Sequence, residues 1–72
     1  MPTEIPAHIT GTVWKIEVAL GAQVAEGDTV MIFESMKMEM PLESPAAGRV
    51  TEIRCKEGDA VQEGVTVLVL EP

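Results

Sequence analysis

The residues best suited to chemistry lie together near the middle of the chain, in the run Glu34-Ser35-Met36-Lys37-Met38-Glu39-Met40. Lys37 is the one basic residue between Lys15 and Arg49. An exposed lysine amine is protonated at neutral pH, which makes it a poor nucleophile unless another group removes the proton. We therefore do not expect Lys37 to be a catalytic base. It is better suited to modification by an enzyme that supplies its own base.

The methionines beside this lysine allow two interpretations. Large apolar side chains next to an exposed amine cost solvation, and a plain turn would not need them. Methionine commonly packs back onto neighbouring strands, and composition favours this interpretation for Met36 and Met38. The alternative is an adaptable apolar rim that a partner protein recognises.

The same run should form a tight hairpin. An apolar, β-branched run ends at Glu34, and the next strand begins near Glu39. Two-residue hairpin turns favour Gly, Asn or Asp, and the connection contains none of them. Non-glycine residues are therefore expected at costly backbone angles, a form of strain that often marks a functional position.

An internal repeat indicates which elements hold this hairpin. An offset of 37 residues, which brings Gly11 onto Gly48, aligns the two halves of the chain without a gap. The matched positions are glycines and core-type aliphatics, together with Glu26/Glu63, Thr29/Thr66 and Glu34/Glu71: Gly11/Gly48, Val13/Val50, Ile16/Ile53, Gly21/Gly58, Val24/Val61, Gly27/Gly64 and Val30/Val67. We interpret residues 1–72 as one domain built from halves of approximately 1–36 and 38–72.

The local patterns predict an all-β fold. Strands are expected at 11–18, 29–34, 48–55 and 66–71, with a bulge or twist where the apolar step from Val13 to Ile16 is three residues. Frequent glycines and prolines leave little room for a helix. The expected architecture is two antiparallel sheets, related by a pseudo-two-fold axis and packed as a flattened sandwich or barrel.

Composition narrows the function. The formal net charge is −7, from 12 acidic and 5 basic residues, which disfavours nucleic acid and anionic membranes as partners. His8 has no second histidine or nearby cysteine, so no metal site is expected. Cys55 should be a small core residue, and Trp14 should cover an end of the core or contact a partner. One cysteine and no export signal favour a cytoplasmic location.

Glu34-Ser35-Met36-Lys37-Met38 resembles the biotinylation motif of biotin-dependent carboxylases, Glu-Ala-Met-Lys-Met, with Ser35 in place of alanine. The resemblance covers nearly the whole chain. It implies a flattened barrel of two four-stranded sheets in which a biotin protein ligase attaches biotin to Lys37. Glu34, Ser35, Met36 and Met38 would form the motif that the ligase recognises. The loaded domain would carry a carboxyl group between a biotin carboxylase and a carboxyltransferase, without being an enzyme itself.

Two other functions stay open. A lipoyl carrier resembles the same fold with a lysine on the same turn, but lipoyl domains usually place Asp before that lysine, where this chain has Met36. An unmodified structural or interaction module is the second possibility, although it would have no need for Met-Lys-Met at a hairpin tip. A small enzyme has no supporting set of residues.

Overall fold

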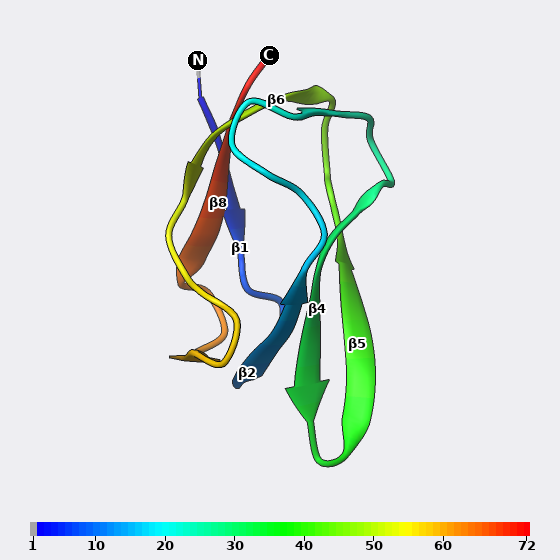
Figure 1. Ribbon diagram of the computed structural model, residues 1–72, viewed down its shortest axis with the longest axis vertical. Helices are drawn as coiled ribbons and strands as arrows, with labels where there is room; N and C mark the ends of the chain where they lie inside the picture. The colour runs from blue at the N-terminus through cyan, green and yellow to red at the C-terminus, as the bar shows by residue number, and fades with distance from the viewer. Residues whose placement is uncertain (1) are drawn as a thin grey trace.

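A computed structural model describes residues 2–72 and folds them entirely into strands and turns (Figure 1). Two four-stranded antiparallel sheets form, with orders β1-β8-β6-β3 and β5-β4-β2-β7. We call the first the terminal sheet, because it holds both chain ends, and the second the hairpin sheet. The strands are β1 (Thr3–Pro6), β2 (Gly11–Ile16), β3 (Gln23–Val24), β4 (Thr29–Ser35), β5 (Met38–Glu43), β6 (Gly48–Ile53), β7 (Ala60–Val61) and β8 (Thr66–Glu71).

The two sheets repeat one another through the offset seen in the sequence. Moving 37 residues along the chain takes β2 onto β6, β3 onto β7 and β4 onto β8, and places β1 within β5. The pairings follow, since β8 lies between β1 and β6 as β4 lies between β5 and β2. The prediction of an all-β fold with two quasi-symmetric four-stranded sheets is confirmed.

A bulge interrupts each of the two long inner pairings. The β2–β4 register shifts between Val13 and Lys15, and the β6–β8 register shifts between Val50 and Glu52. These are equivalent positions, and they coincide with the three-residue apolar step that predicted a bulge. The expected strands 11–18 and 48–55 are shorter in the structure, ending at Ile16 and Ile53.

The core lies between the sheets and draws on equivalent residues from both. Its largest fully buried side chains are Phe33, Ile5, Met31, Leu68, Leu70, Val13, Val30, Val50 and Val67. Burying such a side chain stabilises the fold by about 1.5–3 kcal/mol. Cys55 packs at the margin of this core. Trp14 lies at the bulge of the β2–β4 pairing and is 47% exposed, so it is not part of the buried core.

The long axis of the molecule separates the chain ends from the hairpin. The molecule measures 33 × 18 × 17 Å. The start of β1 and the end of β8 lie at the top of Figure 1, and the β4–β5 hairpin turns at the bottom. The pairing of Thr3 with Leu70 and of Ser35 with Met38 places these two features at opposite ends of the two sheets.

Candidate functional site

The predicted hairpin is present, and its turn contains two residues. Ser35 pairs with Met38 as the last rung of the β4–β5 ladder, so only Met36 and Lys37 lie between the strands. Their φ angles are +52° and +64°, and they are the only non-glycine residues with positive φ in residues 2–72. Positive φ at both central positions is the signature of a type I′ turn, whose twist matches that of the flanking strands. The predicted backbone strain is confirmed.

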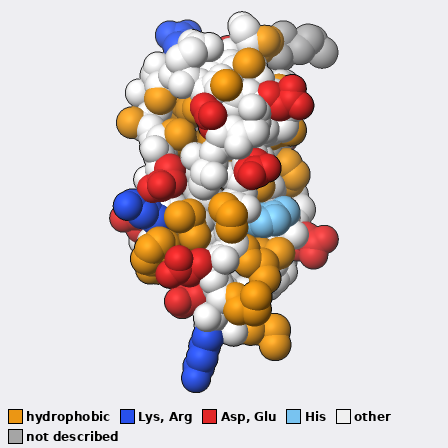
Figure 2. All heavy atoms as spheres, turned by 90° about the vertical axis from the view of Figure 1, so that its right-hand side faces the viewer, with side chains coloured by type: hydrophobic (Ala, Val, Ile, Leu, Met, Phe, Trp, Pro, Cys, Tyr) orange, Lys and Arg blue, Asp and Glu red, His pale blue; other side chains and the backbone are white. Residues whose placement is uncertain are grey.

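This backbone presents the lysine to solvent. Lys37 is exposed, and the side chain of Met36 is 92% exposed and that of Met38 58% exposed. In Figure 2 a basic side chain projects from the hairpin end of the molecule, with hydrophobic side chains gathered above it. The expectation that both methionines pack back onto the strands is wrong for Met36, because the left-handed backbone directs its side chain away from the sheet. The alternative, an apolar rim beside the lysine, describes the surface.

Packing below the turn makes its position rigid. Phe33 is fully buried and pairs with Val13 on one side and Met40 on the other. The His8 ring lies over this region, with its centroid 5.6 Å from that of Phe33. The strand that ends in Ser35 is therefore anchored at Phe33, two residues before its end.

Gly11 allows strand β2 to pass close to the backbone of Glu34 in β4. A Cβ at Gly11 would lie 2.6 Å from the Glu34 carbonyl oxygen, closer than real Cβ atoms come to any atom. Only glycine lets β2 run this close to the base of the hairpin. Sequence reasoning found Gly11 as a repeat position but assigned it no role at the site. Its equivalence to Gly48, whose Cβ would lie 2.8 Å from the Glu71 carbonyl oxygen, was the available signal.

Two carboxylates face one another at the base of the turn. Glu34 pairs directly with Glu39, and both are exposed. Like charges opposite one another destabilise a sheet, so this acidic pair is not explained by the stability of the hairpin. Lys37 is the one cation in the run 34–40, and acylation of its amine would remove that charge.

The other reactive groups of the chain do not join this site. Burial, followed by the nearby charge of Asp59, raises the pKa of the Cys55 thiol, which lowers its thiolate fraction and makes it a weaker nucleophile than a free cysteine. Within residues 2–72 no group of three or more His, Cys, Asp and Glu side chains could hold a metal ion. The described part of the chain also contains no pocket and no helix able to cross a membrane.

Comparison with known proteins places this geometry in a family. Residues 1–70 match the biotin/lipoyl family model, described as "Biotin-requiring enzyme". The chain belongs to the biotin/lipoyl attachment family. One member, the biotin/lipoyl attachment protein of Bacillus subtilis, is 42% identical over 66 residues, which are 92% of this chain and 90% of that one.

Other members of the biotin/lipoyl attachment family are named as carriers or carboxylases. The biotin carboxyl carrier protein of acetyl-CoA carboxylase from Solanum lycopersicum is 36% identical over 93% of this chain and 96% of that protein. Urea carboxylase of Kluyveromyces lactis superposes with a TM-score of 0.92 at 37% identity over 99% of this chain, which spans only 6% of that enzyme. The family predicted from the sequence is confirmed, and the fold is shared with a domain of a much larger carboxylase.

Proposed function

We propose that this domain is a biotin carboxyl carrier in which Lys37 receives biotin. The observation that carries the proposal is the strained two-residue turn, which holds one amine at the exposed end of a rigid hairpin. A turn of this length needs no lysine and no pair of methionines for its own stability. Glu34, Ser35, Met36 and Met38 supply the surface by which a biotin protein ligase recognises the site.

The attachment step uses one atom of this chain. The Lys37 amine, once the ligase has taken its proton, attacks the carbonyl carbon of the biotinyl adenylate. The N–C amide bond forms, the bond from that carbon to the phosphate oxygen breaks, and AMP leaves. The side chain of Lys37 is exposed, as this attack requires. Once attached, biotin supplies the ring nitrogen on which a carboxyl group is carried.

In the later reactions the domain carries the attached biotin to the active sites of its partners. A rigid body with the modified residue at one end and both chain ends at the other can deliver that residue to two active sites in turn (Figure 1). Tethering raises the local concentration of the attached group at each site. The partners we propose are a biotin carboxylase and a carboxyltransferase, with the domain non-catalytic and cytoplasmic.

Lipoylation of the same amine is a second candidate. The relative from Bacillus subtilis that is 42% identical is named for attachment of both biotin and lipoate. The exposed turn offers the same amine to either ligase. Met36 at the position before the lysine, in place of Asp, favours biotin.

Co-expression with each ligase tests these assignments. With biotin protein ligase and biotin, the intact mass should rise by one biotinyl group, and Lys37→Arg should abolish the gain. Lys56→Arg is the matched control, since Lys56 is also exposed and its carbonyl oxygen accepts from the N–H of Asp59 across a turn. This variant should be modified like the wild type. Modification by a lipoyl ligase alone would overturn the biotin assignment. An unmodified protein with both ligases would favour an interaction module.

A further inference from the structure

The two sheets provide an internal comparison of surfaces. Because the strands superpose through the offset of 37 residues, each outward position on the hairpin sheet has an equivalent on the terminal sheet. Residues that the fold requires should be similar at both positions. A surface residue that differs in character between the two sheets needs another explanation.

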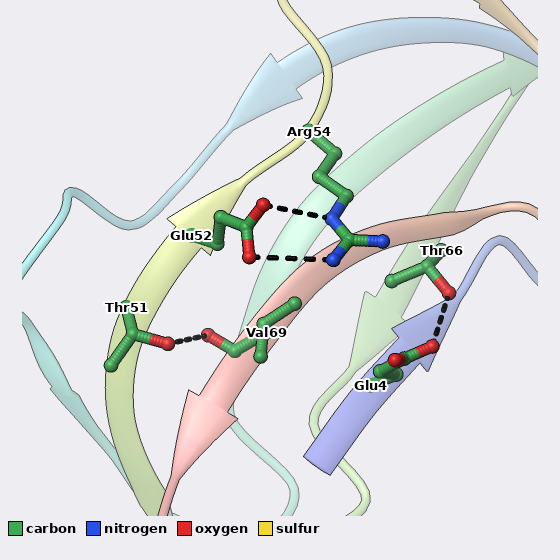
Figure 3. Close-up of polar contacts among 6 residues, drawn as sticks. All are labelled: Glu4, Thr51, Glu52, Arg54, Thr66 and Val69. Atoms are coloured by element: carbon green, nitrogen blue, oxygen red, sulfur yellow. Dashed lines mark hydrogen bonds and ion pairs between the residues drawn. The ribbon is translucent and has the colours of Figure 1, made fainter. Parts of the chain in front are cut away.

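The outer face of the terminal sheet satisfies its own polar groups (Figure 3). Thr51 is the bulge residue, and its hydroxyl donates to the carbonyl oxygen of Val69 at 3.3 Å. Arg54 donates to Glu52 at 3.0 Å, and the Thr66 hydroxyl donates to Glu4 at 3.0 Å. These bonds leave a polar surface typical of one that faces water.

The hairpin sheet has an ion pair at the equivalent positions, but it has no polar residue at the bulge. Lys15 and Glu17 form an ion pair of 3.5 Å at the positions of Glu52 and Arg54, with the charges reversed. The bulge residue, however, is Trp14, which is 47% exposed where the other sheet has Thr51.

One more outward position changes from polar to apolar, and a second is apolar on both sheets but more exposed on the hairpin sheet. Exposed Pro41 occupies the position of Glu4, and half-buried Ile32 occupies that of Val69, which is 6% exposed. Ile32 pairs with Pro41 on one side and with Lys15 on the other, and Trp14 directly precedes Lys15 at the bulge. The three apolar residues therefore come from neighbouring points on the adjacent strands β5, β4 and β2.

We propose that this group of Trp14, Ile32 and Pro41, which we call the tryptophan face, is where biotin protein ligase docks on the domain. The inference rests on the proposed function. The terminal sheet shows that the same backbone folds with polar residues at the Trp14 and Pro41 positions, so the fold does not require an exposed indole there. A half-exposed tryptophan among smaller apolar residues is the type of side chain that dominates protein interfaces.

A ligase that contacts Lys37 through an interface of ordinary size would also contact the tryptophan face. A stable interface buries about 800 Å² on each partner, roughly a fifth of the 4403 Å² surface of the domain. A circular patch of that area has a radius of about 16 Å. Ile32 lies five residues before Lys37, which is about 16 Å at the rise of a β-strand. A footprint centred on Lys37 therefore reaches the tryptophan face.

Charge and reach favour the ligase as the occupant. Glu34 and Glu39 lie between Lys37 and the tryptophan face and give that approach a negative charge. An enzyme that holds ATP and an acyl adenylate needs basic groups around its acceptor entrance. The unmodified lysine side chain is short, so its amine can reach the ligase active site only if the surface of the domain lies against the ligase. The longer biotinylated arm lets the domain stand further from a carboxylase.

Ligation kinetics test the proposal. Trp14→Thr installs the residue that the second repeat carries at the equivalent bulge, so the backbone is compatible. We expect kcat/KM for biotinylation to fall about tenfold through KM, with kcat unchanged, as for loss of an interface hot spot. Leu20→Thr is the control, because Leu20 is 67% exposed and its neighbour Gly21 donates to Val50 near the chain ends. It should match the wild type.

The outcomes separate the two proposals. Wild-type kinetics for Trp14→Thr, with thermal unfolding unchanged, would overturn the docking face and leave biotinylation intact. Failure of the wild-type domain to accept biotin would overturn the proposed function instead. An equal loss in Leu20→Thr would also contradict the docking face, because the effect would then follow surface hydrophobicity in general.

A direct probe of contact needs no substitution at the tryptophan. Trp14 is the only tryptophan, so 5-fluorotryptophan labelling yields one ¹⁹F signal. In the Lys37→Arg variant, which forms a complex without turnover, that signal should shift or broaden on addition of the ligase. A signal that responds only to biotin carboxylase, or only to rising concentration of the domain itself, would assign the face to that partner or to a second copy and overturn the ligase proposal.

Discussion

Replacing Met36 by glycine should make the domain more stable and a poorer ligase substrate. Met36 has a φ of +52°, and a left-handed backbone costs an L-residue about 1–2 kcal/mol that glycine does not incur. The greater freedom of glycine in the unfolded chain offsets roughly 0.5–1 kcal/mol of that gain. Because the Met36 side chain is 92% exposed, its removal forfeits almost no burial.

The net stabilisation for Met36→Gly is therefore about 0.5–1 kcal/mol, obtained by subtracting these two contributions. For a domain of this size it corresponds to a rise in Tm of roughly 2–8 °C. Thermal unfolding followed by circular dichroism measures the shift. Initial rates with biotin protein ligase should fall, since the apolar rim beside Lys37 is lost. This combination is expected where strain is kept for function.

Met38→Gly is the matched control for this prediction. Met38 also neighbours Lys37, but it belongs to strand β5 and has no positive φ. Glycine there should lower the free energy of unfolding by about 0.5–1 kcal/mol, because a residue in extended strand conformation gains nothing from the conformational freedom of glycine. The reasoning would be refuted if Met36→Gly left Tm unchanged or lowered it, or if both substitutions changed Tm in the same direction.

Three further predictions concern the scaffold. Gly11→Ala and Gly48→Ala should each lower the free energy of unfolding by about 1–3 kcal/mol, measured by urea titration, because the added methyl group overpacks against a carbonyl oxygen. Only Gly11→Ala should also slow biotinylation of the folded protein. Phe33→Ala should cost about 3–5 kcal/mol, and retention of a cooperative transition at the wild-type Tm would contradict the packing described below the turn. Because burial raises the pKa of the Cys55 thiol, its alkylation by iodoacetamide should reach half-maximal rate at a higher pH in the folded than in the urea-unfolded protein; coincident profiles would disprove this.

The backbone path was predictable because glycines, prolines and core aliphatics each have strict requirements for backbone conformation or burial. Glycines and aliphatics that recur at one offset indicated paired strands, and the step from Val13 to Ile16 indicated a bulge that both halves possess. The lack of Gly, Asn or Asp between Ser35 and Met38 indicated strain at the turn, which the φ angles confirm. Each of these signals can be read from residue types and their spacing along the chain.

The direction of individual side chains was less predictable. Trp14 was expected to cover an end of the core or contact a partner, and its 47% exposure at the bulge depends on the pairing between β2 and β4. Met36 is exposed because both turn residues are left-handed, so side-chain direction followed from a backbone state that composition does not report. The role of Gly11 required knowing that Glu34 lies beside it across the sheet.

The most direct test of the account is a peptide map of the protein purified from its own cells. Trypsin does not cleave after an acylated lysine, so biotin on Lys37 would preserve the peptide from Ile16 to Arg49 with the added mass of one biotinyl group. We predict that this peptide is present and that fragmentation places the group on Lys37. Complete cleavage into peptides 16–37 and 38–49, with no added mass on either, would contradict the central claim.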